Sequence, residues 1–185
     1  MSNIVIIYGS SEGQTAKIVD RIAGVIREKG HTVEVIDGRA LPAYFTLEPY
    51  TAAIIGASIH AGGYQKYIRT FVQRYHDALE GMPSAFFSVS LTEASSHPEE
   101  KAPLEDLIAA FMQKTGWHPR WVASFAGALA YSKYGFLKRR VMQRIARKEG
   151  APTDPTRDYE FTDWEAVTRF AENFVDTLNP VQVGS

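Results

Sequence analysis

The first fifteen residues constrain the fold of this chain more than any other stretch. Residues 4–8 are apolar and rich in β-branched side chains, which favours a strand, and a helical pattern starts at about Ala16. Between them lies a glycine- and hydroxyl-rich loop, residues 9–15. A strand that turns directly into a helix aligns several backbone N–H groups, and the helix dipole adds partial positive charge. The stretch therefore predicts a cradle for an anion, most simply a phosphate.

The loop lacks the common phosphate-binding motifs. A nucleoside-triphosphate loop needs a lysine where Gln14 stands, and the dinucleotide fingerprint Gly-x-Gly-x-x-Gly is missing. The absence of cysteine excludes a phosphatase with a cysteine nucleophile. Gly13 would let the backbone approach a phosphate, while Ser10, Ser11 and Thr15 would add neutral hydroxyl donors. The alternative is an ordinary strand-to-helix turn capped by serine or threonine.

Length and composition limit what else the chain can be. Its 185 residues suit a single domain, residues 1–185, with a substantial core. Without cysteine there are no disulfides or sulfur-based metal centres, and we expect no metal. The net charge of −1 does not favour a nucleic-acid partner, and it leaves the oligomeric state open. The longest apolar stretch, residues 121–131, is shorter than the roughly 20 residues that span a bilayer. We therefore expect a cytoplasmic protein, with any membrane contact peripheral.

Strands and helices alternate along the sequence. Strands are predicted at residues 4–8, 32–36, 52–57, 84–89 and 121–125. Helices are predicted at residues 16–29, 65–79, 103–114 and, after a capping box at 162–165, up to about Leu178. This order predicts an α/β fold: a doubly wound, five-stranded parallel sheet in three α/β/α layers. Ligands of such sheets bind at the carboxyl ends of the strands, where the loops at Gly9, Ser58 and Ser90 would meet.

An extra segment, residues 131–160, lies between the fifth strand and the last helix. Its cations are Lys133, Lys138, Arg139, Arg140, Arg144, Arg147 and Lys148. Four apolar residues, Leu137, Val141, Met142 and Ile145, recur near helical spacing. The segment thus predicts a helix with one apolar and one cationic face, a pattern typical of binding to an anionic membrane surface. The alternative is that the apolar stripe packs on the domain and the basic face is only solvated.

Five motifs follow one another in a specific order and spacing. They are residues 13–15, residues 55–59 with Gly62 and Tyr64, residues 82–89, residues 127–129 and residues 162–165. On these motifs the chain resembles the flavodoxin-fold family over nearly its whole length. Within that family it is most similar to the menaquinone-dependent protoporphyrinogen IX dehydrogenases. The resemblance implies a flavodoxin-like fold and FMN as the cofactor.

The resemblance also implies where FMN would lie. The phosphate would bind to loop 10–15, and the flavin ring would lie between loops 58–64 and 90–93. The implied cofactor-binding residues are Ser10, Ser11, Glu12, Gly13, Gln14, Thr15, Ser58, Ile59, His60, Ala61, Gly62, Gly63, Tyr64, Ser90, Leu91 and Thr92. Flavodoxins usually carry a hydroxyl residue where Glu12 stands. We therefore expect the Glu12 carboxylate to turn to solvent and only its N–H to face the phosphate.

His60 and Tyr64 each have two possible roles. His60 beside the flavin would suit proton transfer, because flavin reduction couples electrons to protons; otherwise it bonds backbone or solvent. Tyr64 would stack on the ring or shield its edge, or else anchor the helix that follows. We assign no catalytic side chain, because the redox chemistry belongs to the cofactor.

The resemblance implies oxidation of protoporphyrinogen IX to protoporphyrin IX, a step of heme biosynthesis, with electrons passed to menaquinone in the membrane. The basic segment would then meet either the inner face of an anionic membrane or the propionates of the substrate. Loop 93–101 carries Glu93, Glu99 and Glu100 where a more basic loop is expected in these dehydrogenases. The alternatives are a flavodoxin acting as a soluble electron carrier and a related FMN quinone reductase. A carrier usually has an acidic docking face, which the near-neutral charge and the basic segment do not favour.

Overall fold

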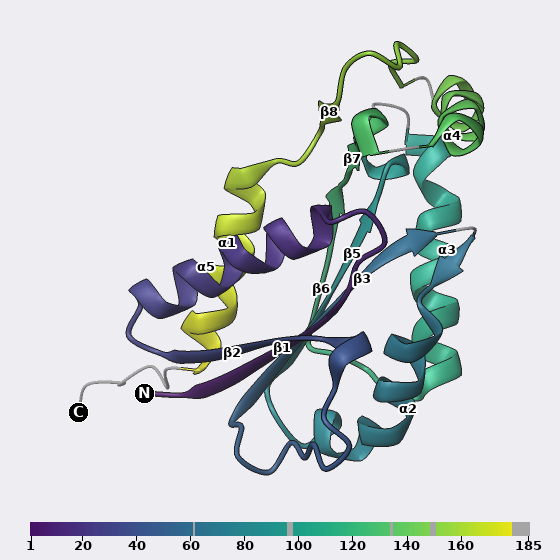
Figure 1. The fold of residues 1–185 in the computed structure, drawn as a ribbon. Helices are drawn as coiled ribbons and strands as arrows, with labels where there is room; N and C mark the ends of the chain where they lie inside the picture. The colour runs from purple at the N-terminus through teal and green to yellow at the C-terminus, as the bar shows by residue number, and fades with distance from the viewer. Residues whose placement is uncertain (61, 96–97, 134, 149–150, 179–185) are drawn as a thin grey trace.

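A parallel β-sheet forms the centre of the structure, a computed structural model that describes residues 1–60, 62–95, 98–133, 135–148 and 151–178. Its parallel strands are β1 (Asn3–Gly9), β2 (Thr32–Asp37), β3 (Ala52–His60), β5 (Ser84–Ser90) and β6 (Trp121–Ala126). They are arranged in the order β2-β1-β3-β5-β6 (Figure 1). The order reverses between β1 and β3, which is where such sheets bind ligands. The predicted doubly wound sheet is confirmed.

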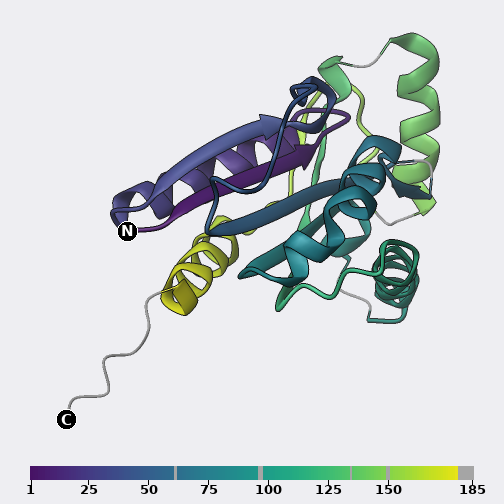
Figure 2. The ribbon, with the colours of Figure 1, turned by 90° about the horizontal axis from the view of Figure 1, so that it is seen from below.

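Helices cover both faces of this sheet (Figures 1 and 2). α1 (Gln14–Glu28) and α5 (Trp164–Leu178) pack on one face, where Ile22 and Phe174 lie in the core. α2 (Lys66–Glu80) and α3 (Pro98–Thr115) pack on the other, around Phe71 and Trp117. Strands covered on both sides must be apolar throughout, which explains the unbroken apolar runs in the sequence. The three-layer architecture is therefore as predicted.

Two predicted helix starts are wrong. α3 begins at Pro98 rather than Pro103, which lies inside the helix. The polar residues before Pro103 are good helix formers, and acids are favourable near a helix N-terminus, so their polarity did not indicate a loop. The cap of α5 is Asp163 and not Thr162, because Asp163 Oδ1 accepts the Ala166 N–H at 2.9 Å. The Thr162 hydroxyl instead donates to the Ala126 carbonyl at 2.8 Å.

Short elements that the sequence did not predict flank the carboxyl ends of the strands. β4 (Gly63–Tyr64) turns back antiparallel on β3, with Ile59 opposite Tyr64. β7 (Ala128–Leu129) pairs antiparallel with β8 (Tyr159–Glu160). The short helices are η1 (Gly38–Ala40), η2 (Thr92–Ala94) and η3 (Tyr131–Lys133). Two-residue strands carry almost no periodicity, so sequence patterns cannot reveal them.

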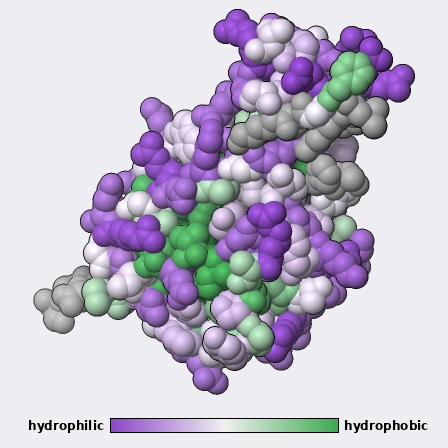
Figure 3. All heavy atoms as spheres, viewed as in Figure 1, coloured by the Kyte–Doolittle hydropathy of each residue, from purple (hydrophilic) through white to green (hydrophobic). Residues whose placement is uncertain are grey.

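The extra segment forms α4 (Phe136–Lys148), which confirms the predicted helix. β7 and β8 pair at the point where the segment leaves and rejoins the domain, and Figure 1 shows α4 projecting beyond the sheet. Met142 and the buried Ala146 pack with Leu129 and Tyr131 in a small separate cluster. Figure 3 shows mainly hydrophilic atoms over this projecting end. Among the helices of the described residues, none combines the length and the apolar character that a membrane span requires.

Candidate functional site

The loop between β1 and α1 is shaped as an anion cradle. Ser10 Oγ accepts the Gly13 N–H at 2.9 Å. Gly13 has a φ of 96°, a left-handed conformation that favours glycine, and it occupies the N-cap of α1. No side chain of the described residues caps this helix, and its first turn contains no acid. The N–H groups and the partial positive charge of the helix N-terminus are therefore available to an anion.

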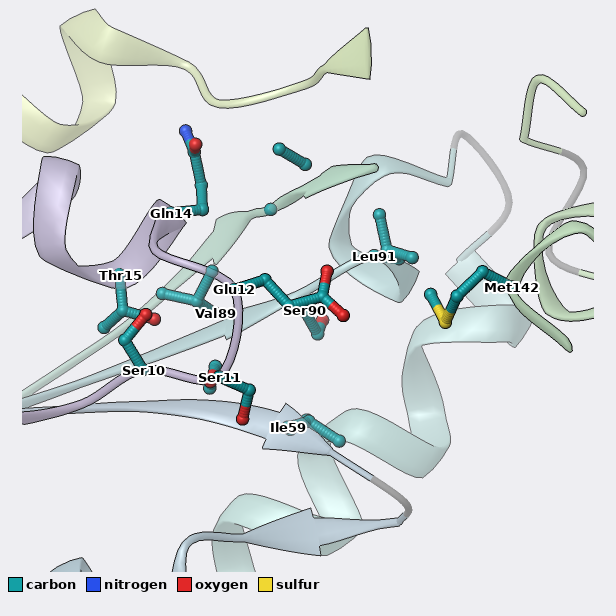
Figure 4. A pocket seen from close by; sticks show the side chains of 13 residues that line it. Ser10, Ser11, Glu12, Gln14, Thr15, Ile59, Val89, Ser90, Leu91 and Met142 are labelled. Carbon is teal, nitrogen blue, oxygen red and sulfur yellow. The ribbon is translucent and has the colours of Figure 1, made fainter. Parts of the chain in front are cut away.

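A cavity lies beside this cradle at the carboxyl ends of three neighbouring strands (Figure 4). Its lining residues are Ser10, Ser11, Glu12, Gln14, Thr15, Ser58, Ile59, Val89, Ser90, Leu91, Gly127, Ala128 and Met142. They come from the loop after β1 and the start of α1, from the ends of β3 and β5, from the junction of β6 and β7, and from α4. The structure thus brings together the three loops that the sequence singled out.

Some predicted residues lie beside the cavity rather than in its lining. Gly13 borders a neighbouring hollow near the β7–β8 pair. Thr92 begins η2 directly after the lining residue Leu91. Ala61 and the side chain of His60 lie outside the described residues. The role of His60 in proton transfer therefore stays a prediction.

The hairpin of β3 and β4 directs Tyr64 into the core. The Tyr64 ring packs edge-on against Phe86 and Phe111, with centroid distances of 5.4 and 5.1 Å. Its hydroxyl donates to Ser88 Oγ at 2.8 Å. Burial raises the pKa of Tyr64 to about 12, although the Ser88 hydrogen bond opposes this shift. Tyr64, with Gly62 and Gly63, borders a separate hollow next to α3. These ring and hydroxyl contacts are with β5 and α3, so both roles, at the flavin and as an anchor of α2, stay predictions.

Two polar side chains of the cradle point away from its hydroxyl groups. Gln14 Nε2 donates to Thr162 Oγ1 at 2.8 Å, so the side chain is tied to the start of α5. The backbone N–H of Gln14 remains at the helix N-terminus. The Glu12 side chain points away from Ser10 and Thr15 in Figure 4, on the side of the cavity where Leu91 and Met142 lie. That Glu12 offers only its N–H to a phosphate remains a prediction.

Sequence reasoning missed several residues of this site. Val89, Gly127, Ala128 and Met142 line the cavity but were not among the predicted cofactor-binding residues. Gln65 Nε2 donates to Ser58 Oγ at 2.7 Å and to Ser11 Oγ at 3.2 Å, so one amide joins two cavity loops. Its only signal in the sequence was a polar residue at a predicted helix start. Met142 was recognised as part of an apolar stripe, but no pattern indicated that α4 would place it in the cavity wall.

Comparison with known proteins identifies the family. The sequence matches the flavodoxin domain family over residues 5–156. The chain belongs to this family. It is 34% identical over 174 residues to a protoporphyrinogen IX dehydrogenase (quinone) from Leishmania major, covering 92% of this chain and 73% of that protein. It is 33% identical over 170 residues to the enzyme of the same name from Escherichia coli K12, covering 90% and 91% respectively.

The fold comparison agrees with the family. Oxidised flavodoxin 1 from Bacillus cereus superposes with a TM-score of 0.59 at 24% identity, covering 96% of this chain and all of that protein. FMN is the cofactor of this family member, which is an FMN-dependent oxidoreductase. The donor set of the cradle fits an FMN phosphate, because its helix N-terminus and hydroxyl groups can bind a dianion without a lysine.

Proposed function

We propose that this protein oxidises protoporphyrinogen IX to protoporphyrin IX, a step of heme biosynthesis, and passes the electrons to menaquinone. The observation that carries the proposal is the likeness to two dehydrogenases of this name over at least 90% of the chain. The unaligned remainder is shorter than the segment 131–160, so the likeness extends into that segment. We take residues 1–185 as one FMN-binding domain in which this segment is an insertion.

The cavity would supply the contacts that such a reaction needs. Loop 10–15 would hold the FMN phosphate through helix N–H groups and hydroxyls, and Ser58, Ile59, Ser90 and Leu91 would flank the flavin. His60, Ala61, Gly62, Gly63, Tyr64 and Thr92 would complete the hairpin and loop around the ring. Bound FMN supplies the two-electron redox chemistry. Met142 and Leu91 would exclude water from the wall that faces α4.

The projecting end of the molecule suits contact with an anionic membrane, where the quinone resides. Phe136 is 73% exposed, and the Arg140 guanidinium lies 4.8 Å from its ring centre. Arg144 and Arg147 are also exposed on α4, whereas Arg139 is half-buried. The side chains of Lys133, Lys138 and Lys148 lie outside the described residues. Exposed cations each contribute about 1 kcal/mol near an anionic surface, and an aromatic ring can enter the interface.

Anaerobic stopped-flow absorbance tests the reaction. The FMN-loaded protein is mixed with protoporphyrinogen IX and then with a menaquinone analogue. We expect bleaching near 450 nm, roughly where oxidised flavin absorbs, followed by recovery with the quinone. A flavin that stays oxidised with the porphyrinogen but exchanges single electrons with a reductase would make the protein an electron carrier and overturn the proposal.

Vesicle sedimentation tests the membrane contact. The triple variant Arg140→Glu, Arg144→Glu, Arg147→Glu should lose binding to vesicles that contain anionic lipid, while its FMN content stays normal. A matched control reverses three exposed cations elsewhere, Lys66, Lys114 and Arg120, with the same change in net charge. Binding by the natural protein should weaken as salt rises. If both triple variants bound the vesicles equally, the basic face of α4 would not be a membrane-binding surface and would simply be exposed to solvent.

A further inference from the structure

Gln65 connects two loops of the cavity through a single amide. It is the N-cap of α2, and its backbone carbonyl accepts the N–H groups of Ile68 and Arg69 at 3.1 and 3.2 Å. From this fixed backbone the side chain reaches across to the cradle. Nε2 donates one hydrogen bond to Ser58 Oγ at 2.7 Å and another to Ser11 Oγ at 3.2 Å. The two N–H bonds of the amide are thereby both used.

These bonds determine what the two hydroxyl groups can do. An oxygen that accepts an N–H bond must direct its own O–H elsewhere, and accepting a bond makes the hydroxyl a stronger donor. Ser11 and Ser58 both line the cavity. Gln65 therefore leaves two hydroxyl protons for a guest. If an acceptor replaced Nε2, both hydroxyls would donate their protons to that acceptor, and neither proton would be available to a ligand in the cavity.

Close packing holds the amide in place. Gln65 Oε1 is buried and has no hydrogen-bond partner among the described residues. A side-chain carbon at Gly9 would lie 2.7 Å from this oxygen and 2.8 Å from Ile68 Cγ1, so glycine leaves the space that the side chain fills. An unpaired buried acceptor is unfavourable and uncommon. The unpaired Gln65 Oε1 therefore indicates that the amide is positioned for its contacts at the cavity and not for the stability of the fold.

We propose that Gln65 makes Ser11 and Ser58 hydrogen-bond donors toward the cavity and so sets the preference for FMN over riboflavin. Because one amide nitrogen bonds both hydroxyls, Ser58 Oγ lies next to Ser11 of loop 10–15, at the end of the cavity where the phosphate would bind. The phosphate dianion of FMN gains most from directed donors there, and riboflavin lacks this group. Gln65 acts through the two serines, so it is a specificity-determining residue that transfers neither electrons nor protons. The inference depends on FMN binding and is independent of the porphyrinogen substrate.

Flavin fluorescence titrations of the apoprotein test this role. In Gln65→Glu an acceptor carboxylate replaces the donor, and we expect the ratio of riboflavin to FMN dissociation constants to fall by at least about ten-fold. Gln65→Met keeps the length but removes the donor without adding charge. For it we expect a smaller fall of about three-fold, because the hydroxyls become free to rotate.

Gln73→Glu is the matched control. It makes the same chemical change within α2, where Gln73 Nε2 donates to the Lys114 carbonyl at 2.9 Å. The ratio of its riboflavin to FMN dissociation constants should equal that of the natural protein. Circular dichroism of each apoprotein verifies folding, and if Gln65→Glu does not fold, the Gln65→Met ratio decides. If folded Gln65→Glu kept the natural ratio of riboflavin to FMN dissociation constants, the proposal would be overturned. If Gln65→Glu does not fold, the same unchanged ratio in Gln65→Met would overturn it.

Discussion

The cavity has two walls with different support. One wall consists of the ends of β1, β3 and β5, whose buried residues continue directly into the two large cores of the domain. The other wall includes Met142 of α4, which packs in the small cluster around Leu129, Tyr131 and Ala146. Regions with few buried apolar contacts open locally at lower free energy than the core. The sheet wall should therefore keep the cofactor site in shape, while the α4 wall can move independently.

The largest effect should come from the loop between β1 and α1, with Gly13→Val. A β-branched residue is disfavoured at a φ of 96°, and its side chain would crowd the anion that the loop cradles. We expect the FMN dissociation constant to rise by about 100-fold or more and the free energy of unfolding to fall by only about 1–2 kcal/mol.

Gly24→Val is the control for the new side chain. Gly24 lies within α1, and a carbon added there meets no atom within 4 Å. This variant should bind FMN normally in the same fluorescence titration. Normal FMN affinity in Gly13→Val would show that the cradle does not hold the phosphate.

A second effect should appear in the α4 wall, with Tyr131→Ala. Tyr131 is fully buried, and its hydroxyl donates to the Pro152 carbonyl at 3.0 Å. Its truncation would leave a void in a small cluster, so we expect proteolysis within 131–160 to accelerate by about ten-fold or more. The thermal midpoint of the domain should change by less than about 3 °C.

Tyr44→Ala provides a comparison, because Tyr44 is 91% exposed. It should change neither the cleavage rate nor the thermal midpoint. A fall in the midpoint of Tyr131→Ala as large as that of the sheet-core variant Phe87→Ala would mean that the two walls unfold together.

The smallest effect should come from Glu160→Gln. Glu160 lies in β8, at the point where the segment that carries α4 rejoins the domain. Burial alone would raise the pKa of Glu160, but hydrogen bonds from Trp164, Lys17 and Gln14 outweigh it and lower the pKa below 4.5. A lowered folded-state pKa means that the carboxylate stabilises the fold above that usual value and loses this effect as the pH falls.

The thermal midpoint of Glu160→Gln should accordingly lie slightly below that of the natural protein at pH 7. The difference should disappear as the pH falls toward 3. Glu172→Gln controls for the loss of a surface carboxylate, since the Glu172 side chain on α5 forms a partly exposed 3.7 Å ion pair with Lys29 at the end of α1. A difference for Glu160→Gln that persists unchanged at pH 3 would contradict the assigned role of the carboxylate.

The sheet wall was predictable from the sequence, whereas the α4 wall was not. Apolar runs that end in glycine and serine place β1, β3 and β5 and their loops, because parallel strands bring their carboxyl ends to one edge. The position of α4 depends on a two-residue strand pair and a few tertiary contacts, which leave no periodic pattern. Gln65 was missed for the same reason, since a helix-start residue gives no sign of the loop that it will contact.

The pairing of β7 with β8 has a consequence for how this protein can be altered. Ala128 lies opposite Glu160, so the extra segment leaves and re-enters the domain at neighbouring points. The Phe161 N–H also donates to the Gly127 carbonyl at 3.1 Å, which closes this junction. A short hairpin turn could join these ends without displacing any strand of the central sheet. The segment is thus a module that design could exchange, and any replacement would have to supply the part of the cavity wall that Met142 now forms.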